Sequence, residues 1–187
     1  MKLIKKTLTE ISNNFNILAE TSIPQIEEAA KIMIKSLKSG GKVMFCGNGG
    51  SASDAQHLSA ELVGRYKRKR QPLASVALTT DTSIITAISN DFSFDYIFSK
   101  QVESIGKEGD VLYAISTSST SKNVINALKV ANKLKIKTLG VTGYDDSGFK
   151  TICDNIISVP ASRPDRIQEM HIAVGQIICE ILEEELC

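Results

Sequence analysis

The sequence predicts an α/β fold in which a mainly parallel sheet is covered by helices on both faces. Short apolar runs of strand length alternate with longer segments of helical periodicity along the chain. The apolar run at residues 43–46 leads directly into a glycine-rich turn and a helix. A second run, at residues 110–115, leads in the same way into a hydroxyl-rich loop and a helix. This repeated order is typical of parallel strands joined by helical crossovers.

Composition excludes several classes of protein. The 187 residues are 42% apolar, which suits one globular domain with a full-sized core. The net charge of +1 gives no general attraction to nucleic acid or to acidic membranes. The longest apolar stretches are strand-sized, and the N-terminus has no apolar block of the signal-peptide type. Because Cys46, Cys153, Cys179 and Cys187 lack metal-binding spacing, we expect reduced, mostly buried thiols in a cytoplasmic protein without membrane contact.

Two helices are expected before the first strand. Apolar residues recur at helical spacing across residues 3–21, and Pro24 begins a second helix that Gly40 and Gly41 end. One alternative is that both helices cover their own sheet. We favour the other, that residues 1–39 help to pack subunits together within a single domain that spans residues 1–187.

Residues 43–65 are the stretch around which the chain is organised. Gly47, Gly49 and Gly50 allow a sharp turn and a close approach of a ligand to the backbone. The predicted helix at residues 51–63 begins there with free N–H groups, a place that binds anions and above all phosphate. His57 and Glu61 are four residues apart and share a face of that helix. A phosphate cradle beside an imidazole and a carboxylate suggests chemistry on a phosphorylated small molecule.

The basic run at residues 65–70 raises the possibility of nucleic-acid binding. The run is short and contains one aromatic residue, so we interpret it as a solvated loop and expect no nucleic-acid partner.

The remaining elements follow in order. Strands are expected at residues 73–78, 110–115, 138–141 and 155–159, with helices at 82–89, after the hydroxyl loop, and at 165–184. Asn90 and Asp91 are interpreted as a polar turn, and the aromatic residues at 92–98 as a core or interface cluster.

The two loops are expected to converge on one site, because ligands of such sheets bind beyond the carboxyl ends of the strands. Residues 116–121 are six consecutive serines and threonines, whereas capping a helix needs only one hydroxyl. Such a run can hold a monophosphate without lysine. The first loop also partly matches a dinucleotide fingerprint. That fingerprint requires an acidic residue at the end of the second strand, but here Asp81 comes too late in the sequence. A dinucleotide enzyme is therefore the least favoured alternative.

Five ordered blocks together resemble the sugar isomerase (SIS) domain family, from about residue 18 to the C-terminus. They read CGNGGSASDAQHLSAEL, ALTTDTS, SNDF, ISTS and RIQEMH. Within that family they are similar to the sedoheptulose-7-phosphate isomerases, also called phosphoheptose isomerases. The resemblance implies a flavodoxin-like, three-layer fold with a five-stranded parallel sheet, and a homotetramer with sites at subunit interfaces. It also implies conversion of sedoheptulose 7-phosphate to D-glycero-D-manno-heptose 7-phosphate, at the start of nucleotide-activated heptose synthesis for lipopolysaccharide or capsule.

The same resemblance implies the site residues. Substrate contacts carry over to Asn48, Gly49, Gly50, Ser51, Asn90, Asp91, Ser116, Thr117, Ser118 and Ser121, with Arg65, Asp165 and Gln168 nearby. Many members carry zinc, with ligands that match His57, Glu61 and Gln168. The usual fourth ligand is a histidine that also acts as catalytic acid/base, and here Gln176 stands in its place. Ser119 likewise replaces a common glycine.

An aldose–ketose isomerisation needs a base at carbon and a group that moves protons between the two oxygens. Glu61 is the candidate base, although its i+4 neighbour Arg65 makes a surface ion pair an equal alternative without the family. With a glutamine at 176, His171 is one candidate for the proton shuttle, and the substrate's own hydroxyls or water are another. A third possibility is a non-catalytic relative that binds a sugar phosphate or a protein.

Overall fold

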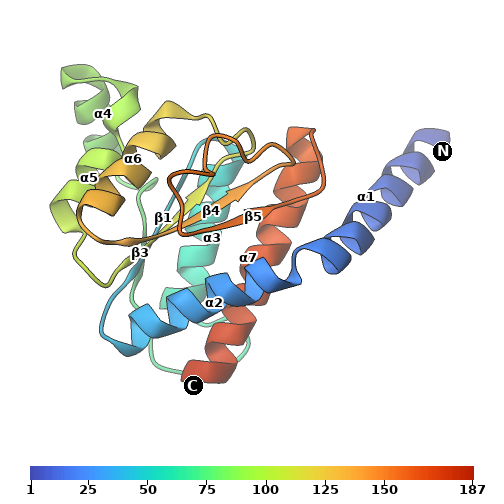
Figure 1. Cartoon of the computed structure of the whole chain (residues 1–187), viewed down its shortest axis with the longest axis horizontal. Coiled ribbons are helices and arrows are strands. Elements are labelled where there is room, and N and C mark those ends of the chain that lie inside the picture. Colours follow the sequence, from blue (N-terminus) through green and yellow to red (C-terminus); the bar gives the residue numbers. More distant parts are fainter.

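The computed structural model describes all 187 residues and contains a five-stranded, fully parallel sheet in the order β2-β1-β3-β4-β5 (Figure 1). Its strands are β1 (Val43–Gly47), β2 (Ser75–Ala77), β3 (Val111–Ile115), β4 (Lys137–Thr142) and β5 (Asn155–Ser158). Its helices are α1 (Lys2–Thr21), α2 (Ile23–Lys38), α3 (Gly50–Val63), α4 (Thr82–Asp91), α5 (Ser99–Ile105), α6 (Lys122–Lys133) and α7 (Pro164–Leu186), with a 3₁₀ turn η1 (Phe94–Tyr96). This is the flavodoxin-like strand order expected from the family resemblance.

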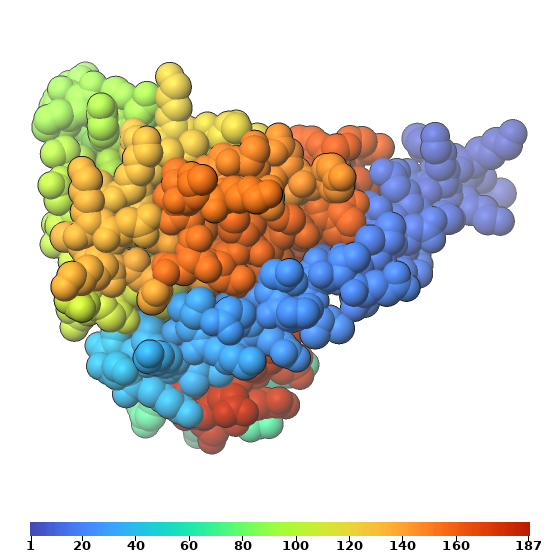
Figure 2. Space-filling view, in the orientation of Figure 1, coloured from blue at the N-terminus to red at the C-terminus, as the bar shows by residue number.

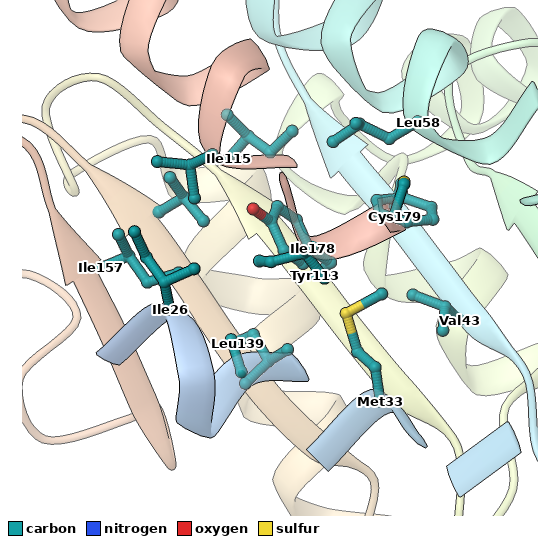
Figure 3. Close-up of a cluster of buried hydrophobic side chains, with 14 of the residues drawn as sticks. Ile26, Met33, Val43, Leu58, Tyr113, Ile115, Leu139, Ile157, Ile178 and Cys179 are labelled. Carbon is teal, nitrogen blue, oxygen red and sulfur yellow. The ribbon is translucent and has the colours of Figure 1, made fainter. Parts of the chain in front are cut away.

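The helices form a layer on each face of the sheet. One core cluster joins α2, α3 and α7 to the sheet through residues such as Met33, Leu58 and Ile178 (Figure 3). Tyr113 of β3 lies at its centre, with its ring 5.3 Å from that of Phe45. The opposite face is covered by α5 and α6 around a second cluster, against which Ile85 and Ile88 of α4 also pack. Because every residue of β1 and β3 is buried, these strands read in the sequence as continuous apolar runs.

The N-terminal helices differ in how they contact this body. Five residues of α2 are buried, whereas Leu18 is the one buried residue of α1. Helix α1 projects away from the rest of the chain, as both the ribbon and the space-filling view show (Figures 1 and 2). No helix of this chain combines the length and apolar character that crossing a membrane requires.

Two local expectations were wrong, and one helix was not predicted. Asn90 and Asp91 form the last turn of α4 instead of a turn after it, because the Asp81 carboxylate caps this helix by accepting the Ile84 N–H at 2.9 Å and the helix continues to Asp91. The aromatic segment leads into α5, a helix that the sequence reading missed. The basic run at residues 65–70 is not simply solvated, since the Arg70 side chain is 3% exposed and paired with Glu183.

Candidate active site

The glycine turn and the hydroxyl loop lie side by side at the carboxyl ends of β1 and β3, which are neighbours in the sheet. Asn48 donates to Asn123 Oδ1 at 2.9 Å, and Asn123 donates back to Asn48 Oδ1 at 2.8 Å. This paired bridge joins the turn before α3 to the first turn of α6. The expected convergence of the two loops is therefore confirmed, although no sequence signal pointed to Asn123.

The glycine turn opens directly into α3. Gly49 precedes the helix with φ +57°, a conformation that glycine adopts without steric cost, and no side chain caps the helix start. Ser51 in the first turn is buried. The first N–H groups of α3 consequently have no side-chain acceptor and face the same end of the sheet as the hydroxyl loop.

The hydroxyl loop is ordered by contacts among its own side chains. The hydroxyls of Ser116 and Ser121 are 3.1 Å apart, and Ser118 Oγ accepts the Thr120 hydroxyl at 2.9 Å. Ser121 precedes α6 without making a capping bond. Ser118 is exposed and Thr117 half-buried, so the loop offers hydroxyls at the surface beside a helix start that Ser121 does not cap.

Ser119 connects this loop to the segment that follows β4. Its φ is +56°, in the left-handed region that favours glycine, and its side chain is fully buried. Ser119 Oγ accepts the Gly148 N–H at 3.1 Å, and Thr117 O accepts the Gly143 N–H at 3.3 Å. Ser119 thus makes a side-chain bond that a glycine at this position could not make.

On the outer face of α3, His57 Nε2 lies 3.0 Å from Glu61 Oε1. The side chains of His57 and Glu61 are 49% and 19% exposed, so both can meet a ligand. Glu61 makes no ion pair with Arg65, whose side chain is exposed and has no acidic partner within 4 Å. The surface-pair alternative for Glu61 is therefore not realised in this structure.

Helix α7 runs alongside α3 in the same direction. A Cβ built on Gly50 would lie 2.6 Å from Gln168 Nε2, which places this side chain against the glycine turn. Further along, Gly175 lies against Leu58, since a Cβ on Gly175 would be 2.5 Å from the Leu58 methyl carbons. The half-buried Gln176 follows Gly175. Along the shared direction of α3 and α7 it is therefore level with His57 and Glu61, further from the glycine turn than Gln168.

His171 lies in the core. It is 1% exposed, and neither ring nitrogen has a hydrogen-bond partner. Burial lowers the pKa of His171 to about 4, an effect that the neighbouring Thr142 backbone only partly offsets. The ring is therefore neutral at physiological pH and out of contact with solvent, which argues against the expected proton-shuttle role.

Asn90, Asp91 and Asp165 make local contacts. The Asn90 amide donates to Asp91 Oδ1 at 2.8 Å at the exposed end of α4. Asp165 lies in the first turn of α7, where Arg163 Nη2 donates to it at 2.6 Å. That bond lowers the pKa of Asp165 and keeps it ionised. Within one chain these groups therefore bond to residues close in sequence and make no bond to the glycine turn or the hydroxyl loop.

Comparisons with known proteins identify the family and support the fold. A model of the SIS domain family matches residues 8–143. The phosphoheptose isomerase of Rhodospirillum rubrum is 52% identical over 164 residues, which cover 88% of this chain and 87% of that protein. The chain belongs to the phosphoheptose isomerase family. The structure of the Neisseria gonorrhoeae phosphoheptose isomerase matches with a TM-score of 0.93 and 39% identity, over 98% of each chain. That of the Francisella tularensis enzyme matches with a TM-score of 0.95 and 34% identity, over 98% of this chain and 97% of the other.

Proposed function

We propose that this member of the phosphoheptose isomerase family interconverts sedoheptulose 7-phosphate and D-glycero-D-manno-heptose 7-phosphate. The observation that carries the proposal is the Asn48–Asn123 bridge, which joins two phosphate-type loops beside the helix that bears Glu61. The product would start nucleotide-activated heptose synthesis.

The starts of helices α3 and α6 bind the phosphate of the substrate. The first N–H groups of α3 and α6, which the side chains of the preceding residues do not cap, carry partial positive charge. Hydroxyls of Ser51, Ser116, Ser118 and Ser121, with Thr117, complete the donors around them. A phosphate held there fixes the far end of the sugar, which then extends along α3 towards Glu61 and lies in one orientation against it.

Glu61 acts as the base at carbon. Its carboxylate removes a proton from C1 of the ketose, C1 and C2 become doubly bonded, and the O2 carbonyl oxygen gains a proton. The enediol then loses the O1 proton, the C1 carbonyl forms, and Glu61 returns its proton to C2. His57 holds the carboxylate in place through the 3.0 Å contact. Because His171 is buried, water or the substrate's own hydroxyls carry the protons between the oxygens.

A zinc ion is proposed as a weakly held partner of the site. His57 and Glu61 already converge and fit two ligand positions, and the amide oxygens of Gln168 and Gln176 would supply the others. No third histidine, cysteine or carboxylate is grouped with them. Amide oxygen is a poorer zinc ligand than imidazole, so binding should be weak. When bound, the ion would polarise the carbonyl oxygen of the sugar.

The chain is further proposed to work as a homotetramer in the cytoplasm, with sites completed at subunit interfaces. Two observations support association. Helix α1 projects from the body, and Leu3, Ile4 and Leu8 on it are 74%, 64% and 60% exposed. Asn90, Asp91 and Arg65 are exposed and available to a neighbouring copy.

The test is an assay with sedoheptulose 7-phosphate, followed by NMR for the aldose anomeric signal. The expected result is product from the native chain and none from Glu61→Gln, with sugar-phosphate binding retained by both. Wild-type turnover in Glu61→Gln would overturn the assignment of the base.

The second candidate is a non-catalytic relative that binds a sugar phosphate or a protein. It is favoured by Gln176, which cannot exchange a proton near neutral pH. Clear binding of the sugar phosphate by the native chain, without any turnover in the presence of added zinc, would select this candidate.

A further inference from the structure

A buried ion pair joins the segment after α3 to the end of α7. Arg70 Nε donates to Glu183 Oε1 at 2.9 Å, and the two side chains are 3% and 2% exposed. The residues are 113 positions apart in the sequence, so the pair connects two elements that only the fold brings together. Neither residue belongs to the proposed substrate or zinc contacts.

The Glu183 carboxylate is saturated with donors. Its Oε1 accepts the Tyr66 N–H at 2.8 Å, and its Oε2 accepts the N–H groups of Lys67 and Arg68 at 2.8 Å and 2.9 Å. Burial by itself would raise the pKa of Glu183, but these N–H bonds and Arg70 outweigh it and lower the pKa to about 2. The carboxylate is therefore ionised at neutral pH and fixes the backbone of the segment that follows Arg65.

Arg70 reaches the last turn of α3 at the same time. Its Nη2 donates to the carbonyl oxygen of Glu61 at 2.7 Å, and its Nη1 donates to that of Leu62 at 2.8 Å. Carbonyls in the last turn of a helix have no partner within the helix. The guanidinium thus occupies two of them, and one of the two belongs to Glu61, the proposed base.

We infer that Glu183 and Arg70 are positioning residues for Glu61, acting through the backbone of the last turn of α3. The inference rests on the proposed role of Glu61 as the base at carbon. Glu183 orients Arg70, and Arg70 fixes the peptide unit that carries the Glu61 side chain. Since a displacement of about 1 Å in a reacting group can cost about 100-fold in rate, loosening this turn should lower kcat.

The neighbouring contacts of the basic run provide a contrast. Lys67 pairs with Glu180, and Arg68 lies 3.7 Å from Glu184, but the four side chains are 41–58% exposed. Exposed ion pairs of this kind contribute little to the stability of the fold. Glu184→Gln therefore removes a carboxylate next in sequence to Glu183 without touching α3, and is the matched control.

The test compares Glu183→Gln, Arg70→Lys and Glu184→Gln in the isomerase assay on the full chain. We expect kcat to fall by about tenfold or more in Glu183→Gln, with less than a threefold change in KM, because the phosphate is held at the opposite end of α3. Arg70→Lys keeps the charge but cannot reach Glu183 and both carbonyls together, so an intermediate kcat is expected. Glu184→Gln should match the native chain.

A double-mutant cycle separates positioning from general destabilisation. Glu61→Asp withdraws the carboxylate directly, so Glu183→Gln should cost much less kcat in that background than in the native one. Circular dichroism at the assay temperature must show that each variant is folded. A native kcat in folded Glu183→Gln, or the same fold-loss in both backgrounds, would overturn the inference. Turnover in Glu61→Gln would instead overturn the proposed base.

Discussion

Ser119 shows how a residue other than glycine can be held in a left-handed backbone conformation. A left-handed φ costs an L-residue about 1–2 kcal/mol, a cost that glycine would avoid. Here the cost is offset by the bond from the Gly148 N–H to Ser119 Oγ, which contributes about 1 kcal/mol. The hydroxyl loop is consequently tied to the segment after β4 by a side chain as well as by backbone.

Two substitutions at this position should separate conformational cost from bonding. Ser119→Ala keeps the left-handed backbone and leaves the half-buried Gly148 N–H without its acceptor, so we expect a loss of about 1–2 kcal/mol in unfolding free energy. Ser119→Gly loses the same bond but relieves the backbone, so it should lie within about 1 kcal/mol of the native chain. Urea denaturation measures both, and equal losses would contradict this account.

Gln176 is the residue whose replacement should increase activity. It lies at the height of His57 and Glu61, and an imidazole there could bind zinc and exchange protons near neutral pH, which an amide cannot. We expect Gln176→His to bind zinc about tenfold more tightly or better by calorimetry, and to raise kcat. Ile177→His, an exposed neighbour on α7 outside the proposed ligand set, is the control. Unchanged zinc affinity in Gln176→His would remove position 176 from the ligand set.

At the scale of elements, the pairing of α7 with the end of α3 predicts a pH dependence of stability. The N–H donors and Arg70 lower the pKa of Glu183 in the fold to about 2, from an ordinary value of about 4.5. A lowered carboxyl pKa stabilises the fold fully above the unfolded value, and the effect is lost as the pH falls from about 4.5 towards 2. At 1.4 kcal/mol per pKa unit this amounts to about 3 kcal/mol at neutral pH.

Urea unfolding of the native chain and Glu183→Gln at several pH values measures this effect. The difference in unfolding free energy should be about 3 kcal/mol at pH 7 and should shrink steadily below pH 4.5. Glu184→Gln, in an exposed pair, should show almost no difference at either pH. A difference that is constant with pH would mean that the carboxylate charge is not what stabilises the pair.

The elements also show what local sequence can and cannot predict. The β1 strand, the glycine turn and α3 were predicted closely, because buried strands, turn glycines and helix periodicity can be recognised from residues that are close in sequence. Helix α5 was missed because residues 99–105 have no distinct stripe, with three of the seven buried only by tertiary packing. The Asn48–Asn123 and Arg70–Glu183 pairs join residues 75 and 113 positions apart in the sequence, so no local sequence pattern predicts them. The burial of His171 likewise follows from where α7 lies on the sheet.

At the scale of the whole molecule, α1 carries an apolar stripe of which only one end is covered. Ile4, Leu8, Ile11, Phe15 and Leu18 follow the alternating spacing of four and three residues that is typical of helices packed side by side. Leu18 is buried and Phe15 packs against the main core, whereas Ile4 and Leu8 are 64% and 60% exposed. A monomer would leave this half of the stripe in water, so a second copy is the expected cover.

Leu8→Glu should therefore change the assembly and leave the fold of each chain intact. The side chain contacts no core residue, so unfolding free energy measured on dissociated chains should change by less than about 0.5 kcal/mol. A charge on the stripe opposes packing by a neighbouring helix, and light scattering should report a smaller assembly than for the native chain. Lys6→Glu introduces the same carboxylate beside the stripe, where it replaces a charge, and should keep the native mass.

If the sites are completed between copies, Leu8→Glu should lose activity on dilution and regain it at high protein concentration. Full activity in a monomeric Leu8→Glu would instead place the entire site within one chain.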